Sequence, residues 1–437
     1  MLRHLSTHAI QHLTLLFNSS LQLGHFPTIW KAAKVIPIHK PNKPPTDANS
    51  YRPISLLSSI SKLLERIIAS RLTTFVNQNH LIPETQLGFR KKHSTVSQLA
   101  RIVDHISHGY NLRKHTGMAL LDLEKAYDTI WIISLLYKLI VLKVPEYLLF
   151  VLRSYLEGRI YTVHINDARS TPISPPAGLP QGAVLSTLFT LYIADIPHPP
   201  DTQLALYADD VAILSQSWRP ETITHRLNSA MSQLLRYFNK WKLWVNVSKT
   251  ELILFTKRRP PVPQPLQFQN VTVPWSNTVK YLGLLLDSKL LFMKHLKTVL
   301  HKATGTFLMI FPLLARDCPL TIPYKILLYK LLRSMITYAA PVWSSTSVTN
   351  YCHLQVYQSV CLRVIGDFTW RTPISNLHAH LQMIPVCLFI YHLTDKFFMS
   401  CPAHPNPLIR NTGNYTLEDL HRQDTKYRHK RIKHILL

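Results

Sequence analysis

Acidic residues are scarce in this sequence. Its 437 residues include 23 Asp and Glu against 49 Lys and Arg, which gives a formal net charge of +26. A surplus of this size, with a pI near 9.9, indicates a polyanionic partner, either nucleic acid or an anionic membrane surface. Because acids are so few, any that cluster between apolar segments require a functional explanation.

Glycine and long apolar runs are also rare. The 11 Gly occur beside 30 Pro without a periodic pattern, which excludes a collagen-like repeat. Even the most apolar region, 135–156, contains charges such as Lys138 and Arg153, which argues against a membrane span. Residues 1–21 lack a clean apolar run and a small-residue cleavage site, so no secretory signal is expected.

The five cysteines are irregularly spaced and lie in the last third of the chain. This pattern predicts no disulfide partner and no zinc site, but buried thiols in a reducing, intracellular compartment, nucleus or cytoplasm. Hydrophobic residues still make up 46% of the chain, which is enough for several packed domains. The sequence therefore predicts a folded, multidomain protein that is not secreted.

Periodicity predicts helices and strands without strict alternation, and hence an α+β fold. Helices are expected over 1–36, from a cap at Ser61 to 72, and over 135–140, 183–193, 222–244 and much of 290–399. Strands are expected at 118–123, 160–165, 203–208, 211–214, 252–255 and 279–286. The Pro-rich stretch 40–53 is predicted to be a surface loop, and the basic tail after Pro402 is expected to be disordered.

Three of the rare acids stand next to predicted strands. Asp122 ends an apolar run, and Asp209 and Asp210 lie at the tip of a predicted hairpin. Such carboxylates can hold two Mg²⁺ ions that clamp the attacking and leaving oxygens of a phosphoryl transfer. Aspartate is also common in turns, so the pair alone is more typical of a polar hairpin turn than of a metal site.

The surrounding residues resemble reverse transcriptases. Residues 206–210 (LYADD) resemble their Tyr/Phe-x-Asp-Asp box, 121–128 (LDLEKAYD) resemble their first catalytic box, and 178–186 (GLPQGAVLS) resemble the template- and nucleotide-contacting box between them. The order and the spacing of the three boxes agree with that family. Further segments resemble jockey-type retrotransposons lacking long terminal repeats: residues 51–56, 86–95, 244–250, 280–287, 337–343 and 362–366.

The resemblance implies a right-hand polymerase. It divides the chain into an N-terminal helical segment (1–24), fingers and palm (25–287), a thumb-like helical region (288–345), a C-terminal helical region (346–400) and a basic tail (401–437). Two departures stand out: no endonuclease-like region precedes residue 35, and Thr187 replaces the usual Pro. A truncated copy without its endonuclease domain is therefore expected.

The implied activity is RNA-directed DNA polymerisation with two Mg²⁺ ions, or Mn²⁺ as an alternative. Its partners would be an RNA template, a DNA primer and deoxynucleotides. Asp122, Asp209 and Asp210 would be the catalytic and metal-binding acids, with the Leu123 carbonyl completing a coordination shell. Asp128 is expected to have a structural role instead.

The resemblance also assigns contacts to other residues. The residues expected to contact the nucleotide are Arg90, Tyr127, Gln181, Gly182 and Lys249. Tyr281 and Gly283 are expected to contact the primer. The residues expected to contact the phosphate backbone of the template–primer are Lys294, His295, Lys297, His301 and Lys302. Each has a structural alternative: a surface cation in a basic loop or on a helix face, a helix-entry turn, a packed strand or a core aromatic.

Other functions fit some of these observations. A catalytically inactive nucleic-acid-binding remnant would keep the basic surface and lose turnover. A membrane-surface protein would need a basic amphipathic segment, which the sequence lacks. Within the enzyme class, a group II intron maturase or a telomerase is the nearest rival, and residues 341–343 (PVW) favour the jockey-like assignment.

Overall fold

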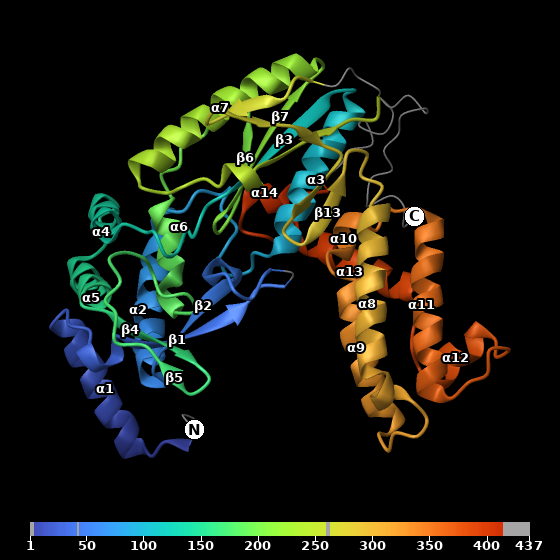
Figure 1. Ribbon diagram of the computed structural model, residues 1–437, viewed down its shortest axis with the longest axis horizontal. Coiled ribbons are helices and arrows are strands. Elements are labelled where there is room, and N and C mark those ends of the chain that lie inside the picture. The colour runs from blue at the N-terminus through green and yellow to red at the C-terminus, as the bar shows by residue number, and fades with distance from the viewer. Residues whose placement is uncertain (1–3, 42, 259–262, 414–437) are drawn as a thin grey trace.

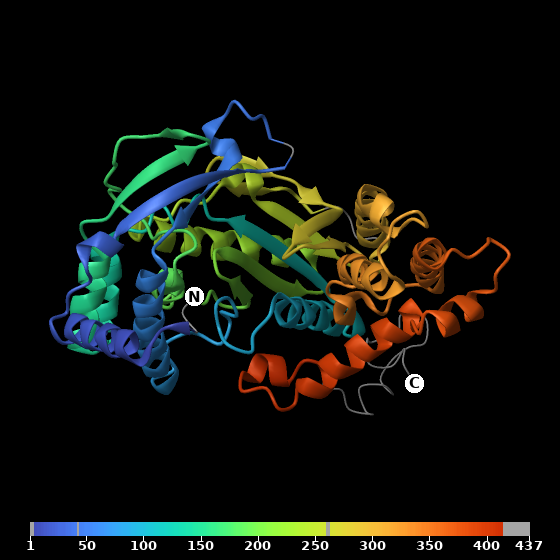
Figure 2. The same cartoon turned by 90° about the horizontal axis from the view of Figure 1, so that it is seen from below.

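The computed structural model describes residues 4–41, 43–258 and 263–413. Its mixture of helices and strands confirms the expected α+β class. Figure 1 shows an arch in which a central sheet lies at the top and two arms extend from it, and Figure 2 shows the same arch from below. In the described ranges, no helix is long and apolar enough to cross a membrane.

The central sheet has five strands in the order β11-β8-β3-β7-β6. The strands are β3 (His115–Asp122), β6 (Gln203–Tyr207), β7 (Asp210–Ser217), β8 (Glu251–Phe255) and β11 (Trp275–Ser276). Side chains alternate along each strand, so Ala119 and Leu121 enter one core and Met118 and Leu120 enter another. Helix α7 (Pro220–Lys240) covers the first face, and α3 (Thr95–Asn111) packs on the second.

The first arm combines a second sheet with helices. Its sheet has the order β2-β1-β4-β5. Its elements are α1 (Thr7–Gln22), β1 (Ala32–His39), β2 (Tyr51–Leu56), α2 (Ser59–Gln78), α4 (Ile132–Val141), α5 (Glu146–Leu156), β4 (Ile160–Ile165) and β5 (Ala168–Arg169), followed by the short helix α6 (Leu188–Tyr192). Its buried apolar side chains join the core beneath α7, so the first arm and the central sheet share one core.

The second arm is helical, as the sequence predicts for 290–399. Its elements are α8 (Met293–Leu314), α9 (Ile322–Ile336), α11 (Val348–Gly366) and α12 (Ile374–His380). Two hairpins precede it, β9 (Leu266–Phe268) with β10 (Val271–Val273) and β12 (Thr278–Tyr281) with β13 (Leu284–Asp287). Three helices return toward the central sheet: α10 (Ala340–Trp343), α13 (Val386–Ser400) and α14 (Pro407–Arg410). The second arm shares the core that contains α3.

Four secondary-structure predictions need correction. The helix predicted over 1–36 ends at Gln22, and 32–39 is a strand. Pro37 lies opposite Pro53 in β2, and β4 pairs only with residues 32–35, so no strand on the other side of Pro37 requires its missing N–H. Helix α2 begins at Ser59, before the predicted cap at Ser61, and the buried Ser61 hydroxyl donates to Glu65 at 3.3 Å within the helix.

The strand predicted over 279–286 is a hairpin. Leu282 and Gly283 form its two-residue loop, and both have positive φ, as the tightest hairpin turns require. The first part of the tail that was predicted to be disordered is folded, because residues 401–413 contain α14 and bury Cys401 and Ile409 against Leu87. The rest of that predicted tail lies outside the described residues.

Candidate active site

The register of the central sheet brings the predicted acids together. Strands β3 and β7 are antiparallel, and Asp122 lies directly opposite Asp210. Directly opposed residues point to the same face of a sheet, with Cβ atoms about 4.5–5.5 Å apart. Asp209 follows Ala208 in the two-residue loop between β6 and β7. The three acids predicted from the sequence therefore meet at one end of the sheet.

Burial and mutual repulsion act on these acids. Burial raises the pKa of Asp209, and the charge of Asp122 raises it further. Burial, followed by the charges of Asp209 and Asp122, raises the pKa of Asp210 to about 6. Like charges held together in a partly buried place favour a proton or a cation between them. This donor set of hard carboxylate oxygens suits a divalent ion such as Mg²⁺.

Lys249 forms an ion pair with one of these acids, Asp122. Its Nζ donates to Asp122 Oδ2 at 2.8 Å from the short 3₁₀ helix Val247–Lys249. The Asn246 N–H donates to the Asp122 carbonyl at 2.8 Å and fixes that helix beside β3. Across the parts of the chain that the structure describes, no three His, Cys, Asp or Glu side chains are already arranged as metal ligands. A divalent ion at the three acids would bind the other Asp122 oxygen, Oδ1, or take the place of the Lys249 ammonium at Oδ2.

Tyr127 stands beside these acids, where the resemblance places an aromatic residue. Its ring lies 5.0 Å from Phe189 and 6.3 Å from Phe89, centroid to centroid. Its hydroxyl is buried and has no hydrogen-bond partner among the described residues. Burial, with the charges of Asp209 and Asp210, raises the pKa of Tyr127, so the hydroxyl stays neutral near the acids.

The predicted nucleotide box at 178–186 is held by a residue that follows β3 and by strand β2. The Gln181 side-chain amide donates to both Asp128 carboxylate oxygens at 3.0 and 3.1 Å, which confirms that Asp128 pairs structurally. Gly182 has φ +93, a conformation that favours glycine, so the turn alone accounts for a glycine at this position. Gly182 is also exposed, which is compatible with the predicted nucleotide contact. The Ser55 N–H donates to the Gln181 carbonyl at 3.0 Å and ties this loop to β2.

Arg90 is engaged by its own loop. Its guanidinium donates to Glu84 at 3.4 Å and to the Gln86 carbonyl at 3.3 Å, and its side chain is only 18% exposed. A triphosphate contact would require the guanidinium to leave these partners. The geometry therefore favours the structural alternative for Arg90.

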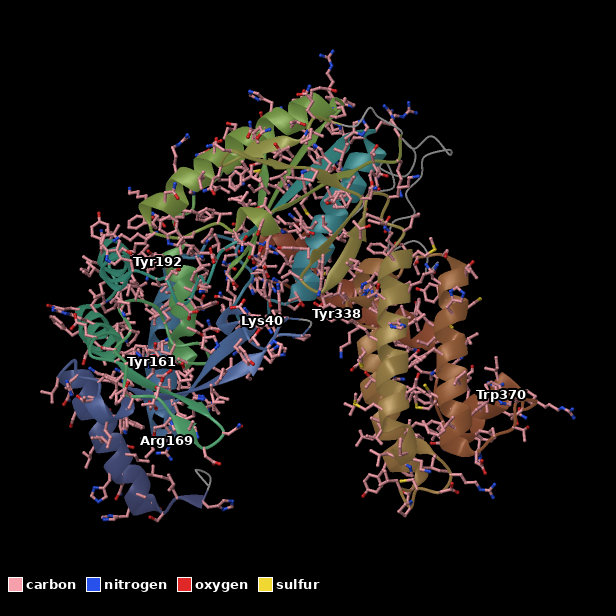
Figure 3. The ribbon with its side chains drawn as sticks, in the orientation of Figure 1. Lys40, Tyr161, Arg169, Tyr192, Tyr338 and Trp370 are labelled. Carbon is pink, nitrogen blue, oxygen red and sulfur yellow. The ribbon has the colours of Figure 1, made fainter. Side chains whose placement is uncertain are left out.

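The predicted primer residues differ in accessibility. Tyr281 is 4% exposed, with its hydroxyl 3.5 Å from the Ala205 carbonyl, so its side chain packs in the core, which favours the packed-strand alternative. Gly283 is exposed at the tip of the β12–β13 hairpin. The Tyr338 hydroxyl donates to the Leu282 carbonyl at 2.7 Å and fixes that tip. Figure 3 places Tyr338 where the second arm meets the central sheet.

The basic residues predicted on the first thumb helix divide between two faces of α8. His295 is buried, and its Nδ1 accepts from the Leu285 N–H at 3.4 Å. The prediction that this side chain contacts a phosphate backbone is therefore wrong. The remaining cations are exposed: Lys294, Lys297, His301 and Lys302. Their spacing keeps them on the solvent side of the helix.

Two buried residues near the site were not predicted. Glu65 on α2 is fully buried and accepts from the Val184 N–H at 2.8 Å, which anchors the end of the nucleotide box. Gln86 is also buried and bonds the backbone of Ala208. The sequence signal that could have found them is a polar residue inside an apolar or loop segment. Such a residue, when buried, needs a hydrogen-bond partner and therefore often holds a neighbouring loop in place.

Comparison with known protein families identifies the class to which this fold and these acids belong. Residues 38–286 match the family described as reverse transcriptase (RNA-dependent DNA polymerase), which is more than half of the chain. The chain therefore belongs to the reverse transcriptase family.

Curated relatives agree with the jockey-like assignment. The chain is 33% identical over 414 residues to the probable RNA-directed DNA polymerase from transposon X-element of Drosophila melanogaster, covering 93% of this chain and 45% of that protein. It is 32% identical over 422 residues to the RNA-directed DNA polymerase from mobile element jockey of the same species, covering 94% and 46%. The predicted resemblance is confirmed, and the chain spans about half the length of these relatives.

A solved structure of telomerase from Candida albicans, in complex with a fragment of telomeric RNA, is similar at a TM-score of 0.47 and 11% identity. The match covers 87% of this chain and 71% of the telomerase chain. That likeness is too weak to support a conclusion about this chain.

Proposed function

We propose that the chain is the RNA-directed DNA polymerase of a jockey-like retrotransposon. The observation that carries the proposal is the meeting of Asp122, Asp209 and Asp210 at one end of the central sheet in a member of the reverse transcriptase family. In the reaction, the primer 3′-OH gives its proton to solvent and attacks the α-phosphate of a deoxynucleotide. A new P–O bond forms, and the bond to pyrophosphate breaks.

The acids would hold two Mg²⁺ ions, or Mn²⁺, with the Leu123 carbonyl as a further ligand. Such ions supply charge stabilisation at the attacking and leaving oxygens. The protein's own contribution is to position groups and to supply fixed charges. The Lys249 ammonium, once released from Asp122, would neutralise the pyrophosphate or protonate it as it leaves. Gly182 and Gly283 would let the nucleotide and the primer approach the backbone closely.

The direct test is elongation of a DNA primer on a homopolymer RNA template by purified protein. Elongation with deoxynucleotides and a divalent ion supports the proposal. Tight binding of template–primer without any elongation would contradict it and would favour the inactive nucleic-acid-binding remnant.

Replacing Tyr127 tests whether this ring excludes the 2′-OH of a ribonucleotide. Its position beside Asp209 and Asp210 supports that role. We expect Tyr127→Val to raise ribonucleotide incorporation relative to deoxynucleotide incorporation by roughly 10- to 100-fold, because a steric clash with the wrong sugar is removed. Both nucleotide types are measured on one template, beside a melting curve.

Tyr155→Val is the matched control for this prediction. Tyr155 is a buried tyrosine whose hydroxyl also lacks a partner among the described residues, but it packs in the first arm. Loss of a core ring costs roughly 3–5 kcal/mol of stability and depresses both activities alike. A folded Tyr127→Val protein with an unchanged ratio of the two activities would reject the steric role.

The raised pKa of Asp210 predicts that binding of a divalent ion depends on pH. The carboxyl titrates near pH 6 in the folded state against 3.8 ordinarily, so the folded state holds the extra proton between these values. In the absence of metal, this group therefore contributes less and less stability as pH rises from about 4 to 6. A metal ion competes with that proton and binds best above pH 6.

Melting curves with and without Mg²⁺ check this expectation. We expect Mg²⁺ to stabilise the protein at pH 8, by about 1.4 kcal/mol at ten times its dissociation constant, and to have little effect at pH 5. Asp210→Asn should abolish the stabilisation at pH 8. Equal stabilisation at both pH values would contradict the assignment of the ion to these acids.

A further inference from the structure

A buried side-chain amide lies under the turn that carries Asp209. Gln86 is 1% exposed, and its amide pairs with both backbone groups of Ala208. Its Nε2 donates to the Ala208 carbonyl at 3.3 Å, and its Oε1 accepts from the Ala208 N–H at 3.0 Å. The same Oε1 accepts from the Gly88 N–H at 2.8 Å.

The residue that Gln86 holds has an unusual backbone. Ala208 has φ +55, in the left-handed region that favours glycine, and it immediately precedes Asp209. A non-glycine residue keeps such a conformation only where its surroundings fix it. The two hydrogen bonds from Gln86 are the contacts that fix both ends of this residue.

The loop that carries Gln86 is itself joined to the edge of the central sheet. The Leu87 N–H donates to the Leu206 carbonyl at 3.0 Å, and the Leu206 N–H donates to the Thr85 carbonyl at 3.0 Å. A Cβ added at Gly88 would lie 2.2 Å from the Ala208 nitrogen, so the loop and the turn are in close backbone contact. The loop therefore cannot move without moving the turn.

Residues far along the chain hold this loop from outside. Asn406 Nδ2 donates to the Glu84 carbonyl at 2.9 Å, and His404 Nε2 lies 3.2 Å from the Lys92 carbonyl. Leu87 packs on Cys401 and Ile409. Figure 2 shows α13 and α14 crossing beneath α3 to reach this place.

We propose that Gln86 is a positioning residue that sets the direction of the Asp209 and Asp210 carboxylates through Ala208, and that residues 401–413 brace it. Gln86 touches neither substrate nor metal ion, and its effect passes through the Ala208 backbone. The catalytic part of this proposal rests on the proposed polymerase function.

Gln98 provides a matched control. It is also fully buried, and its Nε2 donates to the Leu206 carbonyl on the same strand edge at 3.2 Å, but it does not contact Ala208. Gln86→Met and Gln98→Met each replace a buried amide by an apolar side chain of similar length. Gln86→Met removes the three hydrogen bonds of the Gln86 amide. Gln98→Met removes the bond to Leu206 and the one that Gln98 Oε1 accepts from Arg101 Nε at 3.1 Å. Both variants therefore lower stability, and only the first releases the turn.

Hydrogen exchange and steady-state kinetics are measured on the full chain. We expect Gln86→Met to speed exchange of the Ala208 amide at least about tenfold and to lower kcat by about 10- to 100-fold, the usual cost of misplaced reacting groups. KM for the deoxynucleotide and Kd for template–primer should stay within about threefold, since misplaced acids affect the transition state more than ground-state binding. Gln98→Met should leave Ala208 exchange and kcat near parental values, and Asn406→Ala should change both in the same direction as Gln86→Met.

Two outcomes would overturn the proposal: parental exchange of the Ala208 amide in Gln86→Met, or the same loss of kcat in both methionine variants. The exchange measurement needs no activity, so it tests whether Gln86 holds Ala208 even if the parent protein fails to elongate primers. In that case the proposed function fails alone. If Gln86→Met shows parental exchange and the parent elongates primers normally, the positioning role of Gln86 is rejected and the proposed polymerase function stands.

Discussion

Asp209→Asn should reduce primer elongation by about 10²- to 10⁴-fold. The variant keeps the shape of the turn and removes one charge from the acids at the end of the central sheet. Losing one carboxylate of a metal site costs several kcal/mol of transition-state stabilisation, and each decade in rate corresponds to about 1.36 kcal/mol. Affinity for template–primer should change far less, because basic residues and not these acids supply most of the attraction to phosphate.

The control for this substitution is Asp167→Asn, the same chemical change at an exposed position between β4 and β5. It should elongate primers at the parental rate. Steady-state elongation rates are compared with filter-binding or fluorescence measurements of affinity on the same preparations. An Asp209→Asn protein that elongates within a few-fold of the parent would show that the assignment of the acids is wrong.

Affinity for template–primer should fall steeply with salt. The net charge of +26 makes phosphate neutralisation the main source of affinity. Plotted as log K against log salt, the slope should be about −0.9 for each phosphate contact on B-form DNA, and six to ten contacts correspond to a loss of about 10³- to 10⁵-fold between 50 and 200 mM. Sequence should matter little.

The exposed cations of α8 provide the variant for this prediction. Lys297→Ala with Lys302→Ala should make the slope shallower by about two contacts' worth. Arg236→Ala with Lys240→Ala, exposed on α7 at the outside of the arch, removes the same charge and should leave the slope nearly unchanged. A flat salt response of the parent protein would contradict an electrostatic mode of binding.

The sequence predicted the acid site because its signals are local. Apolar runs flank Asp122 and the Asp209–Asp210 pair, and the hairpin geometry follows from two strands and a two-residue loop. The same reasoning predicted one strand over 279–286, because a tight turn at Leu282 and Gly283 interrupts the apolar pattern by only two residues. Local patterns specify elements more reliably than the turns between them.

Contacts between distant residues could not be read in this way. Gln86 and Ala208 are 122 positions apart, so no pattern around either residue indicates their pairing. Arg90 lies in a basic loop that suits phosphate binding, and only the folded structure shows its guanidinium on Glu84 and Gln86. His295 is different: it stands four residues before Val299 and eight before Ala303, on the packed side of α8, and helical periodicity could have predicted its burial.

The bond between Asn406 and Glu84 joins positions 322 residues apart, which gives the chain an order of assembly during synthesis. Ribosomes add about 5–20 residues per second, so the Gln86 loop emerges about 15 to 65 s before its outer brace. From the addition of residue 210 until that of residue 406, the nascent chain holds the aspartate turn without the support of residues 401–413. A chain that is released before residue 406 has been added would therefore lack the hydrogen bond that braces this loop from outside.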